Sequence, residues 1–350
     1  MRIMSQINCD EGDYASEHDD YSRVYRMIMA GWGSQAIAAL AALSVAEHLD
    51  SATLTAEQIA ERESVDVAMA FRLLRNCAAL GLVSFNARIN TFSATPMLRV
   101  LHKDAPTSLK HYAQSVTGPA FWLPAMRLTQ AVRDGRNQAV EALGTNVFEY
   151  LGEHPDDARL FSSAMKDLST PVIREAVSVI DIGKARYAVD VGGASGAFVA
   201  ELVSRHPELT GSVLDLAHVV PAVAEEATRR GLTDRITGIP GDFFDAVPTA
   251  DIYLLKFILH DWDDDTCTKL LSNIRRSMNA SARLFIVEMV VDSDAASLDA
   301  ALMDLAMLFS LTGRERGVAE FEALLSQADL RAVGVAALRG SYRLIEAAPA

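Results

Sequence analysis

The sequence predicts a doubly wound α/β sheet that ends in an antiparallel hairpin and is preceded by a smaller, mainly helical domain. Two observations predict it: apolar strand-like runs alternate with helices after residue 180, and residues 21–110 read as helices with one short hairpin. The 350 residues are enough for two domains, at roughly 100–200 residues each.

The N-terminal region predicts a winged-helix pattern. Ala36–His48 is rich in alanine and leucine, so this helix suits close packing against another helix. Thr55 and Gln58 have the spacing of a capping box at the start of a second helix. The third helix and the two strands of the hairpin are expected at Val67–Leu80, Leu82–Phe85 and Thr91–Ser93.

The second region predicts seven strands. The first five are apolar runs that alternate with helices, which is typical of a parallel sheet. Only Gly340 and Ser341 separate the last two, which predicts an antiparallel hairpin. The expected strands are Tyr187–Val191, Ser212–Leu216, Ile236–Ile239, Asp251–Phe257, Ala282–Val291, Val333–Leu338 and Tyr342–Ala347.

The charge balance narrows the classes of partner. The chain has 32 basic and 46 acidic side chains, a net charge of −14, which repels nucleic acid and anionic membrane surfaces. The expected recognition helix offers only Arg72 and Arg75, and a DNA reader usually shows a basic face. Packing or dimerisation is therefore the favoured role of the winged-helix region, and a small molecule the favoured ligand.

The cysteines and the apolar runs indicate a cytoplasmic protein. Cys9, Cys77 and Cys267 form neither a disulfide framework nor a paired metal motif. The N-terminus is acidic, unlike a signal peptide, and Met27–Leu49 is interrupted by polar residues and glycines, so no membrane span is expected.

A glycine-rich loop follows the first strand of the sheet. In the run Asp190–Gly196, Gly192, Gly193 and Gly196 let the backbone turn sharply and approach a ligand. Asp215 closes the second strand, where a carboxylate can accept hydrogen bonds from two ribose hydroxyls. The pattern predicts a nucleoside site at the carboxyl edge of the sheet.

The details of this loop favour adenosine without phosphates over NAD. The dinucleotide fingerprint needs glycine at positions 194 and 197, and both are alanine. Asp190 would repel a pyrophosphate but suits the ammonium group of a methionine-like ligand. Asp242 could accept from the adenine amino group while Phe243 packs on the ring, although Asp242 could also be a solvated turn carboxylate.

The ordered motifs resemble those of the S-adenosylmethionine-dependent O-methyltransferases, especially the plant caffeate and flavonoid enzymes and the bacterial phenazine and polyketide enzymes. The resemblance covers nearly the whole chain, with Ala194 departing from the family's glycine loop. It implies a Rossmann-like methyltransferase sheet, S-adenosylmethionine as cofactor, and methyl transfer to a hydroxyl of a small, aromatic secondary metabolite. The motifs are Asp190–Gly196, Asp215–Val219, Gly241–Phe244, Leu255–Trp262 and Gly313–Arg316.

The chemistry needs a base that takes the proton of a hydroxyl. His260 follows the fourth strand at the carboxyl edge, and histidine has a suitable pKa. The resemblance assigns His260 as that base, with Glu288 and Glu315 as the acids that flank it. One of the two would accept from the second ring nitrogen and fix the tautomer. The sequence leaves open which one does so.

Neighbouring charges have alternative roles. Glu288 could instead form a salt bridge with Arg283 or Arg314. Asp261 is expected to cap the following helix or contact the cofactor rather than share the proton transfer. Lys256 matches a family position near the cofactor, although a lysine on a strand is commonly a solvated charge.

The resemblance also suggests which residues contact the methyl acceptor. Phe161, Met165, Leu302 and Ser310 are candidate acceptor contacts, although at helical spacing they could equally be core. No cluster shows metal spacing, so no metal is expected.

The expected domains follow the two regions of the sequence. Residues 1–20 are expected to form a disordered acidic tail, 21–110 the dimerisation domain, 111–180 a helical connection and 181–350 the S-adenosylmethionine-binding domain. The resemblance implies a homodimer in which Tyr25, Met29 or Trp32 touches the acceptor of the other subunit.

Two rivals remain open. A few relatives use bound S-adenosylmethionine without transferring its methyl group, in hydroxylation or decarboxylation. A winged helix could also belong to a non-enzymatic regulator, which the acidic N-terminal region disfavours.

Overall fold

The computed structural model describes residues 11–291 and 297–350, and of residues 11–18 it describes the backbone alone. The chain forms two compact units that divide between Pro106 and Thr107. Among the described residues, no helix is both long and apolar enough to cross a membrane.

The first unit holds the winged-helix pattern. Thr55 Oγ1 accepts from the Gln58 N–H, and Gln58 Oε1 accepts from the Thr55 N–H, so the predicted capping box is confirmed. Phe85 and Phe92 stack across the hairpin, with centroids 4.7 Å apart. The elements are α1 (Glu11–Ala42), α2 (Val45–His48), α3 (Ala56–Glu63), α4 (Val67–Ala79), β1 (Val83–Asn86), β2 (Thr91–Ala94) and α5 (Pro96–Arg99).

The acidic N-terminal residues differ in part from the expected disordered tail. Residues 1–10 of that tail lie outside the described residues, but α1 begins at Glu11 and continues to Ala42. No proline interrupts residues 11–42, so nothing in the covalent structure stops the helix from extending through the acidic stretch.

The second unit starts with a series of helices and continues into the sheet. Its helices are α6 (Lys110–Val116), α7 (Pro119–Ala125), α8 (Leu128–Asp134), α9 (Ala139–Leu143), α10 (Val147–Glu153), α11 (Pro155–Val179), α12 (Ala197–Arg205), α13 (Pro221–Arg230), the short 3₁₀ helix η1 (Leu259–Asp261), α14 (Asp264–Ser277), α15 (Leu298–Ser310) and α16 (Val318–Gln327).

The sheet has seven strands in the order β5-β4-β3-β6-β7-β9-β8. The first five in this order pair in parallel, whereas β9 is antiparallel to both of its neighbours, which confirms the predicted fold class. The strands are β3 (Tyr187–Val191), β4 (Thr210–Asp215), β5 (Ile236–Pro240), β6 (Ala250–Lys256), β7 (Met278–Met289), β8 (Leu330–Ala337) and β9 (Tyr342–Pro349).

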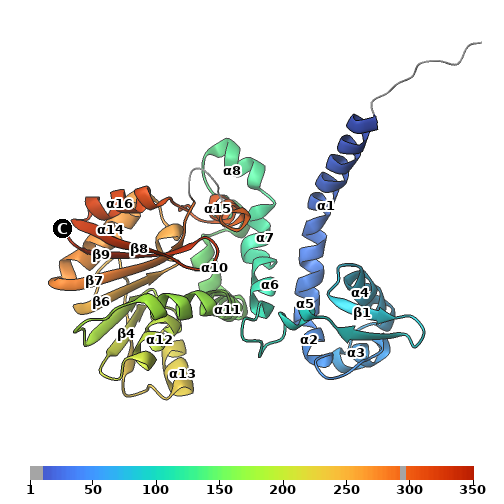
Figure 1. Ribbon diagram of the computed structural model, residues 1–350, viewed down its shortest axis with the longest axis horizontal. Coiled ribbons are helices and arrows are strands. Elements are labelled where there is room, and N and C mark those ends of the chain that lie inside the picture. The colour runs from blue at the N-terminus through green and yellow to red at the C-terminus, as the bar shows by residue number, and fades with distance from the viewer. Residues whose placement is uncertain (1–10, 292–296) are drawn as a thin grey trace, which may run out of the picture. The chain divides into compact units, whose positions relative to one another are not determined.

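Helices cover both faces of the sheet (Figure 1). Buried side chains of α11, α12 and α13 pack on one face, and those of α14 and α16 on the other. Successive residues of β3 alternate between these two cores, with Ala188 in the first and Val189 in the second. Since the strands are buried on both faces, polar side chains of the site are confined to the strand ends.

Candidate active site

The loop after β3 is a close backbone turn around a buried carboxylate. Gly192 and Gly196 have φ of +69° and +76°, which glycine adopts at little cost. A Cβ on Gly193 would lie 2.4 Å from Asp190 Cγ, so only glycine fits there. Asp190 Oδ2 accepts from the Val199 N–H in α12, and burial raises the pKa of this carboxyl group to about 7.

Asp215 lies beside the same loop, at the end of β4. Its Oδ2 accepts from the Ala194 N–H at 2.8 Å and its Oδ1 from the Leu216 N–H at 2.7 Å. Each carboxylate oxygen can accept more than one hydrogen bond, so both can also receive ribose hydroxyls. Ala194 has φ of +51°, a conformation that costs a residue with Cβ roughly 1–2 kcal/mol.

Asp242 and Phe243 follow β5 in a turn. Asp242 is exposed, and its Oδ1 accepts from the Phe244 N–H two residues on. Phe243 is half-buried and its ring lies 3.3 Å from where a Cβ on Gly192 would stand. The ring is thus beside the glycine loop.

The chain is strained where β6 leaves the sheet. Phe257 is a buried non-glycine residue with φ of +56°. Its ring stacks on Tyr342 at 5.3 Å, and the Lys256 ammonium lies 4.4 Å from its centroid. Burial lowers the pKa of Lys256, an effect that Asp190 and Glu288 oppose. The sequence predicted Phe257 and Tyr342 only as strand residues, because spacing along the chain does not show that the two rings stack.

His260 is buried in η1 and is held by one of the two predicted acids. Its Nδ1 lies 2.7 Å from Glu315 Oε1 and 4.0 Å from Glu288 Oε2. Since a carboxylate only accepts, Nδ1 carries a proton and donates it to Glu315. The tautomer therefore leaves Nε2 as the acceptor nitrogen of the neutral ring.

Glu288 holds the backbone of the same turn. Its Oε1 accepts from the N–H groups of Ile258 and Leu259, while its Oε2 is buried with no hydrogen-bond partner. The alternative salt bridge does not form, because Arg283 pairs with Glu346 and Arg314 with Asp264 and Glu320.

For Asp261, the structure contradicts one of the two expected roles, that of helix cap. Asp261 does not cap the next helix: the N-cap of α14 is Asp263, whose carboxylate accepts from the Thr266 N–H. Asp261 Oδ1 instead lies 3.3 Å from His260 Nε2. The physical reason is that η1 ends at Asp261, which leaves room for one extended residue before the cap of α14.

The three carboxylates change the acid–base properties of the imidazole. Burial by itself lowers the pKa of His260, but Glu288, Asp261 and Glu315 outweigh it and raise the pKa to about 10. Burial also raises the pKa of Glu288 to about 7 and that of Asp261 to about 6, against the opposing charge of His260. The ring thus has an unusually high proton affinity.

The expected acceptor contacts lie in different surroundings. Phe161 stacks on Phe121 at 5.6 Å within a helical core cluster. Met165 is half-buried in α11, and Ser310 is buried with its hydroxyl donating to the Ala306 carbonyl. Leu302 is 55% exposed on α15, so it is not a core residue of this chain. Their contact with an acceptor stays a prediction.

Comparison with known proteins decides the family. Residues 126–331 match the O-methyltransferase domain model, and residues 25–104 match the O-methyltransferase dimerisation domain model. The chain belongs to the S-adenosylmethionine-dependent O-methyltransferases. This family methylates hydroxyls of small secondary metabolites, several of them aromatic, and the chain is such an enzyme.

Individual O-methyltransferases resemble the chain along most of its length. The mitomycin biosynthesis 6-O-methyltransferase of Streptomyces lavendulae is 32% identical over 87% of this chain and 87% of its own. A solved structure of mitomycin 7-O-methyltransferase has a TM-score of 0.90 at 30% identity, covering 96% of this chain and all of that one. Human N-acetylserotonin methyltransferase in complex with S-adenosylmethionine has a TM-score of 0.87 at 25% identity, covering 99% of each chain.

The glycine loop and Asp215 lie together at the carboxyl edge of the sheet. A Cβ on Gly192 would meet Ile258 and Phe243, and one on Gly193 would meet Asp190, while Asp215 accepts from the Ala194 N–H of the same loop. S-adenosylmethionine is the methyl donor of the family.

Proposed function

We propose that this O-methyltransferase methylates an aromatic hydroxyl of a small secondary metabolite with His260 as the general base. The observation that carries the proposal is the hydrogen bond from His260 Nδ1 to the buried Glu315 carboxylate, which leaves Nε2 to take a proton. A base held in this way contributes roughly 10²–10⁴-fold to the rate.

The two ring nitrogens of His260 have different roles in the proposed reaction. S-adenosylmethionine supplies a methyl group bound to a positively charged sulfur. Nε2 of His260 takes the proton of the acceptor hydroxyl, and Glu315 stabilises the imidazolium through Nδ1. Asp261, 3.3 Å from Nε2, attracts the proton that Nε2 receives.

An aromatic acceptor suits the proton affinity of this ring. The carboxylates around His260 raise its pKa, so the neutral ring is a stronger base toward a phenol than an ordinary imidazole is. Relatives are named for such acceptors, among them the 3-amino-4-hydroxybenzoate 4-O-methyltransferase of Streptomyces cremeus.

Asp190, Gly192, Gly193 and Gly196 are proposed to cradle the methionine part of the cofactor. Asp215 would bind the ribose. Asp242 and Phe243 would contact the adenine, and Lys256 lies near Asp190 and would balance its charge. The buried loop contacts of Asp190 and Asp215 support these roles.

The enzyme is proposed to be a cytoplasmic homodimer, with the dimerisation domain as the basis. On α1, Tyr25 and Trp32 are 52% and 71% exposed, so an apolar partner surface would cover them. Tyr25, Met29 or Trp32 would then reach the acceptor of the other subunit. The described cysteines, Cys77 and Cys267, are free thiols, which suits a reducing compartment.

The reaction is proposed to need no metal. Nδ1 of His260 and oxygens of Glu288 and Glu315 lie within 4.8 Å of one another, so these groups could hold an ion. However, Nδ1 and Glu315 already form a hydrogen bond, and Glu288 Oε1 binds two backbone N–H groups. These hydrogen bonds support a role of His260, Glu288 and Glu315 in acid–base chemistry rather than in metal binding.

The test is transfer of labelled methyl from S-adenosylmethionine to a panel of phenols, with 3-amino-4-hydroxybenzoate and 3-hydroxy-5-methyl-1-naphthoate as the first probes and their deoxy analogues as controls. We expect an aryl methyl ether from at least one phenol, also in the presence of a chelator. Recovery of hydroxylated or decarboxylated product instead would favour the non-methylating alternative.

A further inference from the structure

The segment that carries Glu315 packs directly on the backbone of the turn that carries His260. A Cβ on Gly313 would lie 2.0 Å from the His260 carbonyl oxygen and 2.4 Å from the Trp262 nitrogen. Both of these are backbone atoms, so they cannot move aside without moving the turn. No side chain fits at position 313 while His260 stays in place.

Arg316 is fully buried and binds the same turn on both sides of His260. Its Nη1 donates to the Leu259 carbonyl at 2.8 Å, and its Nη2 donates to the Trp262 carbonyl at 2.7 Å. Its Nε and Nη2 also donate to Asp264 Oδ1 at 2.9 and 2.7 Å. With a further bond from Nη1 to the Arg314 carbonyl, all five guanidinium N–H donors have an acceptor.

The main chain of Arg316 is itself hydrogen-bonded to the sheet. Its carbonyl accepts from the Val291 N–H, and Arg316 forms a parallel bridge with Val290 beyond the end of β7. β7 also carries Glu288, which accepts from the Ile258 and Leu259 N–H groups of the turn. The turn is therefore held by its N–H groups through Glu288 and by its carbonyls through Arg316.

We propose that Arg316 and Gly313 are positioning residues for methyl transfer, which hold the main chain of residues 259–262 so that His260 keeps its alignment with Glu315 and the acceptor. The inference rests on the proposed function of His260 as the base. Arginine is needed because its planar fork reaches two carbonyls and a carboxylate at once, which a lysine ammonium does not do.

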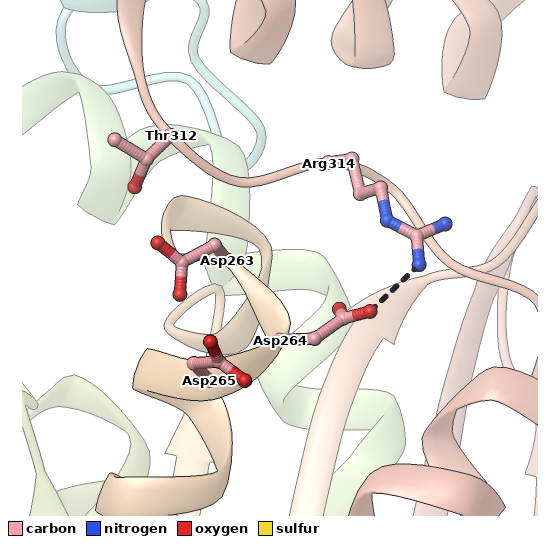
Figure 2. Close-up of a pocket in the computed structure, with 5 residues that line it drawn as sticks. All are labelled: Asp263, Asp264, Asp265, Thr312 and Arg314. Carbon is pink, nitrogen blue, oxygen red and sulfur yellow. Dashed lines mark hydrogen bonds and ion pairs between the residues drawn. The ribbon is translucent and has the colours of Figure 1, made fainter.

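Arg314, two residues before Arg316 in the same segment, offers a matched control. Figure 2 shows it extending from the same segment to Asp264 at the start of α14. It pairs with the exposed carboxylates of Asp264 and Glu320, and no hydrogen bond joins its side chain to residues 259–262 in the part of the chain that is described. Removing Arg314 therefore takes away a neighbouring charge and leaves the turn held.

The experiment compares Arg316→Met, Arg316→Lys, Gly313→Ala and Arg314→Met. With the phenol that the panel identifies, we expect the first three to lower kcat by about 10–10²-fold, since small misplacements of a catalytic group have effects of that size. S-adenosylhomocysteine affinity, measured by calorimetry, should stay within about twofold. The acidic limb of the pH profile should move to lower pH, because His260 loses part of its contact with the carboxylates. Arg314→Met should match the wild type in kcat, in S-adenosylhomocysteine affinity and in the pH profile.

A second measurement needs no acceptor. This measurement is a ¹⁵N–¹H spectrum of the histidine rings with S-adenosylhomocysteine bound, and comparison with His260→Ala assigns the His260 signals. The wild type should show a hydrogen-bonded proton on Nδ1 of His260. Gly313→Ala and Arg316→Lys should lose this signal. Unchanged spectra and unchanged kcat in these folded variants would overturn the positioning role. If no phenol is methylated, the proposed function fails, and the spectra still decide whether Arg316 and Gly313 hold the ring.

Discussion

His260 Nδ1 lies 2.7 Å from Glu315 Oε1, although the two residues are 55 positions apart in the chain. The contact joins η1, which follows β6, to the segment that follows α15. Because both groups are buried, the hydrogen bond is not weakened by exchange with water, and the ring keeps one tautomer whenever it is neutral.

Removal of the base should separate chemistry from cofactor binding. We expect His260→Ala to lower kcat by roughly 10²–10⁴-fold and to leave S-adenosylhomocysteine affinity unchanged by calorimetry. Glu315→Gln should lose less, because the amide oxygen can still accept from Nδ1 without a full charge. Glu320→Gln, whose carboxylate pairs with exposed Arg314, is the control. Full turnover of a neutral phenol by His260→Ala would rule out His260 as the base.

The rate should rise with pH through neutrality. The pKa of His260 is raised to about 10, so at pH 7 the ring is mostly imidazolium and only its neutral form accepts a proton. Since raising the pH below that pKa populates the neutral ring, kcat for an un-ionised acceptor should increase by up to about tenfold per pH unit. An acceptor already ionised at the assay pH should show a flatter profile. A bell-shaped profile of kcat against pH with its maximum near pH 6 would contradict the expected rise.

The residue that binds the ribose should be identifiable from the affinity for S-adenosylhomocysteine alone. Asp215→Ala removes an acceptor for two hydroxyls, a loss of roughly 1–3 kcal/mol, or about tenfold to a hundredfold in the S-adenosylhomocysteine dissociation constant. Asp245→Ala removes an exposed carboxylate from the turn after β5 and should bind like the wild type. Equal affinity of the two variants would take Asp215 out of the site.

The dimer should depend on the apolar side chains of α1. Ile28→Glu with Trp32→Glu places two charges where the side chains are 72% and 71% exposed. If a second copy covers them, light scattering should show the mass of a monomer for this variant and of a dimer for the wild type. Arg88→Glu, in the exposed turn between β1 and β2, should remain a dimer. A wild-type monomer at micromolar concentration would refute the homodimer.

Glu226 should stabilise the second unit in a pH-dependent manner. It is buried in α13 and binds Lys166, Arg229 and Arg230; although burial opposes them, these partners lower its pKa to about 2. The stabilisation is complete above the ordinary pKa of 4.5 and is lost as the pH falls toward 2. Glu226→Gln should therefore lower the free energy of unfolding by about 1–3 kcal/mol at pH 7 and by less at pH 3.5 in urea titrations. An equal difference at both pH values would contradict the ionic origin.

Much of the sheet could be predicted because its strands are continuous apolar runs. Tyr187–Val191 was predicted with the observed bounds. The last parallel strand begins at Met278 rather than at Ala282, because Met278 pairs with Ala250 across a register irregularity that also takes in the polar residues Asn279 to Ser281, which hydropathy does not reveal. The N-terminal helix was underestimated for a similar reason, since charge alone does not distinguish a helix from a tail.

The site was predicted as a set of residues but not as an arrangement. Glu315 rather than Glu288 binds the His260 ring, and Asp261 faces Nε2 rather than a helix terminus. Those outcomes depend on the direction of side chains where three segments meet, which one-dimensional spacing cannot give. Arg316 was visible in the motif Gly313–Arg316, but only its complete burial indicates what it does.

The position of β9 has a consequence for synthesis on the ribosome. β9 follows β8 in the chain, yet it lies between β7 and β8 in the sheet and pairs Arg343 with Glu288. While the ribosome has not yet delivered residues 342–349, the edge of β7 that carries Glu288 has no neighbour on that side. The nascent enzyme therefore presents an open strand edge late in translation, which is a point at which chaperone binding would limit aggregation.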